Sequence, residues 1–180
     1  MVDRARPKGT IVVVGAHPDD ETLGCGGAIA RRVQEGYEVR IVVLTDGEHL
    51  FTVCLGIDTD PSPDDVARLR KDETRRAAAI LGVPRSSVHF LGCEDGGLTA
   101  QGTQATEELA GLLREWAPAE VWSLSGYEQH PDHVAACEVV HAACHLAGGG
   151  MRRLLYVVSL RQGVCYVDIY LAYFGGIGVD

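Results

Sequence analysis

The sequence predicts an α/β fold in which helices cover both faces of a mostly parallel β-sheet. Residues 11–16 form a continuous apolar, β-branched segment, a pattern typical of strands that are buried on both faces, and residues 39–45 predict a second buried strand. Segments with helical character separate the strand candidates along the chain. Strands that alternate with helices favour β–α–β units and a parallel sheet.

The remaining elements follow the same alternation. Gly36 ends a helix predicted over residues 23–35, and Gly82 ends a helix predicted over residues 64–81. The second helix is amphipathic, and its apolar face is predicted to contain Val66, Leu69, Ala77 and Ile80, with Glu73 among them. Residues 51–63 are rich in Asp, Pro and Gly and predict a long loop. Further strands are expected at 88–91, 120–124 and 154–159, and further helices at 103–116 and 134–147.

Length and composition indicate one globular domain over residues 1–180. The 180 residues are 46% hydrophobic and 23% charged, which is ordinary for a chain with a sizeable core. We expect residues 1–9 to be disordered and residues 160–180, which are apolar and glycine-rich, to form an atypical tail. The net charge of −9 argues against nucleic acid or an anionic membrane as a partner.

The six cysteines contain no C-x-x-C pair, so a zinc ribbon or a thioredoxin-like redox motif is not indicated. A chain of this size needs no disulfide framework, and we interpret the cysteines as mostly buried thiols in a reducing compartment. The N-terminal segment lacks the pattern of a signal peptide, and no apolar stretch reaches the ~18 residues of a membrane span. We therefore expect a cytoplasmic protein.

Two motifs concentrate acids and imidazoles at the ends of predicted strands. Residues 16–21 (AHPDDE) follow the first strand, and residues 130–133 (HPDH) precede the last helix. The carboxyl ends of parallel strands share one edge of the sheet, so we expect the two motifs to meet there. A catalytic metal needs about three protein ligands. His17 and Asp20 could bind from one turn and His133 could complete the set, which leaves Asp19 as a base and His130 as a second polar group.

Each motif alone also has a structural interpretation. Acidic residues at a helix start are favoured by capping and by the helix dipole, so this run by itself is equally consistent with a capped helix. A histidine near a helix start, such as His133, is more often structural than a ligand. The glycines at 24, 26 and 27 are interpreted as allowing a close approach of the first helix to the sheet. It is the predicted position of both motifs on one edge that favours a site.

Taken together, residues 16–27, 44–48 and 130–133 resemble the zinc-dependent N-deacetylases of the N-acetylglucosaminyl-phosphatidylinositol de-N-acetylase superfamily, the LmbE-like proteins. The resemblance covers about residues 10–158. It implies a Rossmann-like three-layer αβα sandwich. It also implies removal of an N-acetyl group from an N-acetylglucosamine-type amino sugar or its conjugate, which gives a free amine and acetate.

The resemblance also implies roles for individual residues. His17, Asp20 and His133 match the ligands of one Zn²⁺ per chain, although another divalent metal is compatible. Asp19 matches the general base, His130 the group that stabilises the oxyanion in its protonated form, and Asp132 a residue that orients His130.

Three further positions match substrate contacts of the same family. These are Arg70, Asp95 and Tyr127. The implied partner is a small N-acetylated amino sugar conjugate, and a homo-oligomer is left open. The main alternative is a non-catalytic sugar-binding or structural homologue that retains the metal pocket. A phosphoesterase with two metals would need more bridging carboxylates, and a nucleotide-binding domain would need the G-x-G-x-x-G fingerprint.

Overall fold

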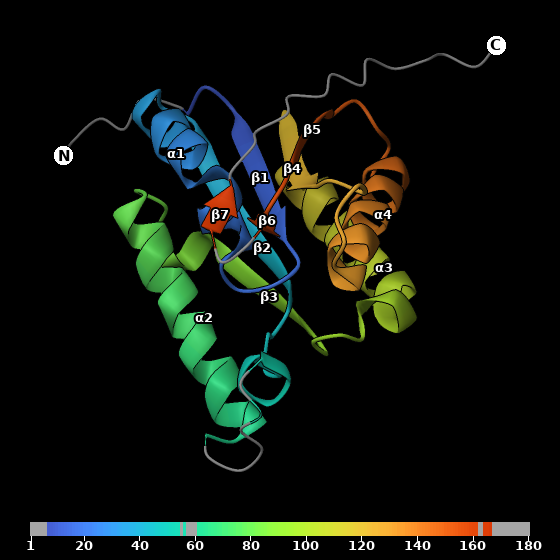
Figure 1. Ribbon diagram of the computed structural model, residues 1–180. Helices are drawn as coiled ribbons and strands as arrows, with labels where there is room; N and C mark the ends of the chain where they lie inside the picture. Colours follow the sequence, from blue (N-terminus) through green and yellow to red (C-terminus); the bar gives the residue numbers. More distant parts are fainter. Residues whose placement is uncertain (1–6, 55, 57–60, 162–163, 167–180) are drawn as a thin grey trace.

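The computed structural model describes residues 7–54, 56, 61–161 and 164–166, and contains a five-stranded, all-parallel sheet (Figure 1). The strands lie in the order β3-β2-β1-β4-β5. Their bounds are β1 Thr10–Gly15, β2 Glu38–Thr45, β3 Val88–Cys93, β4 Glu120–Leu124 and β5 Arg152–Tyr156. The predicted α/β class and the Rossmann-like arrangement are therefore confirmed.

Helices cover both faces of this sheet. Figure 1 shows α1 and α2 on one side, and α3 and α4 on the other, where they pack against each other. Their bounds are α1 Asp20–Gln34, α2 Pro63–Ile80, α3 Leu98–Trp116 and α4 Pro131–Leu146. None of the described helices combines the length and the apolar character that crossing a bilayer requires.

Shorter elements complete the described chain. A π-helical turn, Leu50–Cys54, occupies the start of the segment with the loop-like composition, so the prediction of a loop is wrong there. A 3-10 turn, Arg85–Ser87, precedes β3, and β6 (Ser159–Arg161) pairs antiparallel with β7 (Val164–Tyr166). At the N-terminal edge, the Lys8 N–H donates to the Gly36 carbonyl. Residues 1–6 and 167–180, in the segments predicted to be disordered or atypical, lie outside the described residues.

The hydrophobic core is built around the two central strands. Residues 11–14 of β1 and 41–44 of β2 are completely buried, as their continuous apolar sequences predicted. They pack with fully buried helix residues that include Ile29 of α1 and Leu109 of α3. The buried cysteines Cys25, Cys93 and Cys144 are free thiols, in agreement with the interpretation from sequence.

The buried face of α2 differs from the predicted one. Leu69 and Ile80 are 44% and 86% exposed, whereas Arg70 and Thr74 are buried. The helix turns this polar row inward because the Arg70 guanidinium finds oxygen acceptors beside the first sequence motif. The pattern of apolar residues does not predict the buried face of a helix that carries a buried, hydrogen-bonded cation.

The sheet order brings the two sequence motifs together. β1 pairs with β2 on one side and with β4 on the other, so the chain leaves β1 and β4 toward opposite faces of the sheet. Such a switch point opens a crevice at the carboxyl ends of the strands. Residues 16–19 connect β1 to α1 and residues 125–130 connect β4 to α4, so both motifs lie at this crevice.

Close packing of α1 requires a glycine at position 24. A Cβ atom at Gly24 would overlap the ring of Tyr156, whose hydroxyl donates to the Val14 carbonyl at 2.7 Å. We expect Gly24→Ala to lower the free energy of unfolding by about 1–3 kcal/mol through overpacking. Gly27, about one turn away with no neighbour within 4 Å, is the matched control.

Gly27→Ala should leave the stability unchanged or raise it by about 0.5–1 kcal/mol, because alanine is the better helix former. Urea unfolding of both metal-free variants tests this difference. Equal unfolding midpoints for the two variants would contradict the packing role of Gly24.

Candidate metal centre

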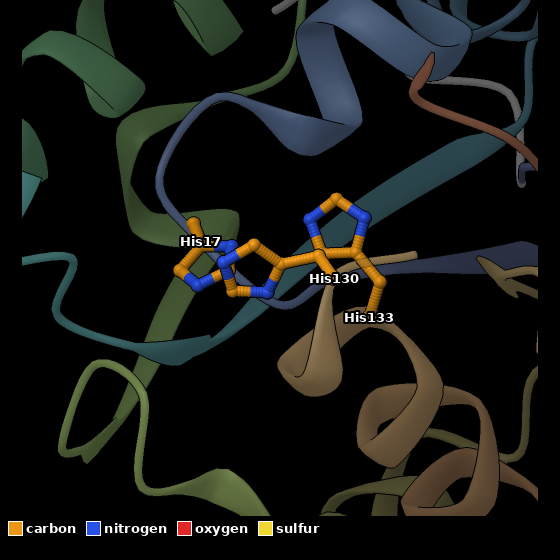
Figure 2. A group of neighbouring side chains, drawn as sticks. All are labelled: His17, His130 and His133. Atoms are coloured by element: carbon orange, nitrogen blue, oxygen red, sulfur yellow. The ribbon is translucent and has the colours of Figure 1, made fainter. Parts of the chain in front are cut away.

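Three imidazole rings meet at the crevice, as Figure 2 shows. His17 follows β1, and His130 and His133 stand at the start of α4. The ring centroid of His17 lies 4.7 Å from that of His130 and 5.3 Å from that of His133. His17 and His133 are buried, whereas His130 is exposed. The expectation that two motifs more than a hundred residues apart meet is therefore confirmed.

A tight turn between β1 and α1 places His17. The backbone N–H groups of Ala16 and His17 donate to Oδ2 of Asp20 at 3.0 Å and 2.8 Å. Asp19 precedes the helix with a φ of 141°, a conformation that residues with a side chain rarely adopt. Strain of this kind persists where the surrounding contacts impose it, and it is common at functional sites.

Two of the three predicted ligands, His17 and His133, each contact an oxygen of the third, Asp20. Oδ1 of Asp20 lies 3.3 Å from Nε2 of His133, and Oδ2 of Asp20 lies 3.6 Å from Nδ1 of His17. Two ligands that each bind zinc at about 2.1 Å in tetrahedral geometry are separated by about 3.4 Å. The two contacts are close to this separation but use different oxygens of Asp20. Among the described residues, the ligand atoms of His17, His130 and His133 all lie within 4.8 Å of one another, and nitrogen donors of this kind suit Zn²⁺.

Two further carboxylates contact the other nitrogen of His17. Nε2 of His17 lies 3.1 Å from Oδ1 of Asp95 and 3.2 Å from Oδ2 of Asp132. The Asp132 carboxylate also accepts from the backbone N–H groups of Gly96 and Leu98. His17, Asp95 and Asp132 form a second group that could hold a metal. A ligating histidine usually has its second nitrogen on a carboxylate, which favours Nδ1 of His17 as the metal-facing atom.

The charge balance of the centre favours a bound cation. Burial alone would lower the pKa of His17, but hydrogen bonds with Asp132, Asp20 and Asp95 raise it to about 11. Burial likewise opposes protonation of His133, and its contacts with Asp20 and Glu128 raise the pKa to about 9. The carboxylates thus hold protons on two imidazoles, and a metal ion would replace these protons as the positive charge.

The ring of His130 accepts a backbone hydrogen bond at one of its two nitrogens. Its Nδ1 accepts from the backbone N–H of Asp132 at 3.2 Å, so the neutral ring carries its hydrogen on Nε2. Burial, followed by the charges of His17 and His133, lowers the pKa of His130. The protonated His130 that the family resemblance suggested is therefore disfavoured. It is the backbone N–H of Asp132 that contacts His130, while the Asp132 carboxylate contacts His17.

Asp19 and Arg70 form a pair beside the ligands. The Asp19 side chain is 52% exposed, and its Oδ2 accepts from Nη2 of Arg70 at 3.0 Å. Arg70 is buried and also donates to the carbonyls of Pro18 and Gly47, at 2.8 Å and 3.1 Å. Partial desolvation raises the pKa of Asp19, and Arg70 opposes this rise. In this structure the guanidinium thus holds the turn that carries Asp19.

A cavity of about 210 Å³ adjoins this pair. It lies between the start of α1, the π-helical turn and the middle of α2. Besides Asp19 and Arg70, its lining contains Pro18, Glu21, Thr22, Leu23, Leu50, Glu73, Thr74 and Ala77. The half-exposed carboxylate of Asp19 therefore borders a space that can receive part of a small molecule.

The other predicted substrate residues differ in position. Asp95 lies in the centre against His17, whereas Tyr127, in the loop after β4, is 97% exposed. The structure also reveals acids to which the sequence assigned no role. Glu21 is completely buried, and burial raises its pKa to about 7. Glu128 lies against His133, and Glu48 accepts from the Asp95 N–H at 3.0 Å. Glu48 lies within the 44–48 motif and Glu128 two residues before the 130–133 motif, and these positions are the sequence signals that could have drawn attention to them.

A known protein family shares sequence with the part of the chain that contains both motifs. The family model "PIG-L: GlcNAc-PI de-N-acetylase" matches residues 12–144. The "1D-myo-inositol 2-acetamido-2-deoxy-alpha-D-glucopyranoside deacetylase" of Corynebacterium glutamicum (strain R) is 30% identical over 169 residues, which cover 84% of this chain and 57% of that protein. The chain thus spans a little over half the length of this curated relative.

Two solved structures share the fold. The conserved protein TT1542 from Thermus thermophilus has a TM-score of 0.64 and 34% identity, over 82% of this chain and 64% of that one. The N,N'-diacetylchitobiose deacetylase from Pyrococcus horikoshii has a TM-score of 0.70 and 23% identity, over 93% and 68% of the two chains. The family match runs from β1 to α4 and includes both motifs of the centre. The chain therefore belongs to the PIG-L family of GlcNAc-PI de-N-acetylases, the LmbE-like proteins.

Proposed function

We propose that this chain is a metal-dependent N-deacetylase that hydrolyses the acetamide of an N-acetylglucosamine-type sugar or its conjugate to a free amine and acetate. One observation carries the proposal: His17 and His133, from segments far apart in the sequence, both contact the buried Asp20 beside the half-exposed Asp19. Family membership supports amide hydrolysis, and the named activity of the Corynebacterium relative supports an amino sugar as substrate.

The proposed metal is one Zn²⁺ held by His17, Asp20 and His133. Zinc in such a site polarises a carbonyl and lowers the pKa of bound water to about 7. The acetamide carbonyl is a weak electrophile and water is a weak nucleophile. Polarisation of the carbonyl would counter the first obstacle to hydrolysis, and the lowered pKa of water would counter the second. Another divalent metal with a preference for nitrogen and oxygen ligands is compatible with the same donors.

The side chains around the ligands supply proton transfer and charge stabilisation. Asp19 accepts the proton of the attacking water and then delivers it to the nitrogen of the departing amine, so that the proton is conserved over the reaction. His130 donates its Nε2–H to the carbonyl oxygen as negative charge develops there. The backbone N–H of Asp132 maintains this tautomer, and Arg70 holds Asp19 in place.

Substrate recognition is proposed for Arg70, Asp95 and Tyr127. Arg70 and Asp19 border the 210 Å³ cavity, which offers both polar and apolar walls to a sugar. Asp95 lies 3.1 Å from His17 and can accept a hydroxyl hydrogen at the edge of the centre. Tyr127 is exposed and would have to turn inward to reach the substrate.

Two substitutions separate catalysis from metal binding. Asp19→Asn should keep the metal, because Asp19 is not in the proposed ligand set, and should lower kcat by about 10²–10⁴-fold through loss of the base. His133→Ala should lose the metal itself. Elemental analysis and a free-amine assay on a panel of N-acetylated amino sugars measure the two properties, and Asp64→Asn, which changes an exposed acid at the start of α2, is the control.

Turnover by a metal-loaded Asp19→Asn protein at the wild-type rate would contradict the assignment of the base. A wild-type protein that binds zinc but releases no amine from any member of the panel would favour the non-catalytic alternative.

Metal affinity should rise with pH between about pH 6 and 9. In the metal-free protein the pKa of His133 is about 9 and that of His17 about 11, so both rings must lose a proton before they can bind a metal. The same raised pKa values stabilise the metal-free fold fully below about pH 6.5, and this contribution falls as pH rises through 9 and toward 11.

Chelator competition at several pH values, combined with calorimetry in buffers of different ionisation enthalpy, measures the affinity and the protons released. An affinity that does not change between pH 7 and pH 9, with no proton release, would refute this linkage.

A further inference from the structure

A glutamate with a buried side chain, in the loop between β4 and α4, lies against one of the proposed metal ligands. We propose that Glu128 is a positioning residue: it accepts a hydrogen bond from Nδ1–H of His133 and so keeps Nε2 of that ring directed at the metal beside Asp20. This inference rests on the proposed metal site and adds to it a residue that acts through a ligand.

The His133 ring has one nitrogen that needs a partner. Nε2 lies 3.3 Å from Oδ1 of Asp20, on the side of the proposed metal. Nδ1 is buried and makes no hydrogen bond with the residues that the structure describes. Buried polar atoms of this kind are normally paired. A carboxylate oxygen is the natural acceptor, and Oε2 of Glu128 lies 3.5 Å away, so a small movement completes the bond.

Glu128 is itself held in position. Its side chain is 5% exposed, and Oε1 accepts from the backbone N–H of Val158 at 2.6 Å. Val158 is buried and follows β5, which is the neighbour of β4 in the sheet. The carboxylate therefore connects the loop after β4 with the chain after β5. A carboxylate with so little exposure is poorly placed to bind substrate, whereas it is well placed to orient His133.

The contact with Glu128 bears on which ring nitrogen of His133 carries the hydrogen. A neutral imidazole that binds a metal through Nε2 must carry its hydrogen on Nδ1. A carboxylate at Nδ1 favours this tautomer, fixes the plane of the ring and increases the basicity of the ligand. Glu128 thus has the role that carboxylates beside metal-bound histidines have in other proteins.

The variant Glu128→Gln tests the inference with little change in shape. The amide oxygen can still accept from Val158, but the NH₂ group then faces Nδ1 of His133 and favours the tautomer with hydrogen on Nε2. Zn²⁺ affinity, measured by chelator competition, should fall about 10–100-fold. The visible absorption bands of the Co²⁺-loaded variant should change, while thermal unfolding of the metal-free protein should stay close to that of the wild type.

Glu138→Gln is the matched control, since Glu138 is an exposed glutamate on α4. It should leave the affinity and the Co²⁺ bands unchanged. Wild-type affinity and an unchanged Co²⁺ spectrum in Glu128→Gln would overturn the inference. If Glu128→Gln does not fold, Glu128→Asp keeps the charge but shortens the reach, and wild-type affinity in that variant would also overturn it. A wild-type protein that binds no metal would instead refute the proposed function and this inference with it.

Discussion

The buried carboxylate of Asp20 joins the parts of the molecule on which the candidate site depends. One of its oxygens accepts from two backbone N–H groups at the end of β1, and the other lies beside His133 at the start of α4. The pKa of Asp20 is lowered by His133 and His17, against the effect of burial, so the group remains charged. A buried charge is stable only with such partners. The positions of the turn, the helix start and both histidines are therefore set together.

The turn that Asp20 closes also accounts for the backbone conformation and the exposure of Asp19. The backbone of Asp19 has the unfavourable φ of 141°, and two hydrogen bonds from Arg70 on α2 support the turn at Pro18 and Asp19. The strained residue thereby presents a half-exposed carboxylate at the border of a cavity. Backbone strain, a buried guanidinium and a half-exposed carboxylate occur in one place, and this combination distinguishes the motif from an ordinary capped helix start.

Much of the fold and of the centre was predictable, because local patterns and topology point the same way. Continuous apolar strands predicted a sheet buried on both faces, and the strand-end rule predicted that His17 and His133 meet. The buried face of α2 was mispredicted because the acceptors of Arg70 come from a distant turn that its own sequence does not reveal. The lowered pKa of His130 and the contact of Glu128 with His133 depend on distances of a few ångströms, which no spacing in the sequence encodes.

The position of the centre at the switch point has a consequence for folding. His17 and His133 come from segments more than a hundred residues apart, and they approach each other only when β1 pairs with β4. An unfolded chain cannot present these donors together, so a cation at the centre binds the native state almost exclusively. Such a ligand stabilises the fold by about 2.7 kcal/mol when its free concentration is about 100 times Kd. The supply of metal would then set the stability of the folded chain as well as the occupancy of the centre.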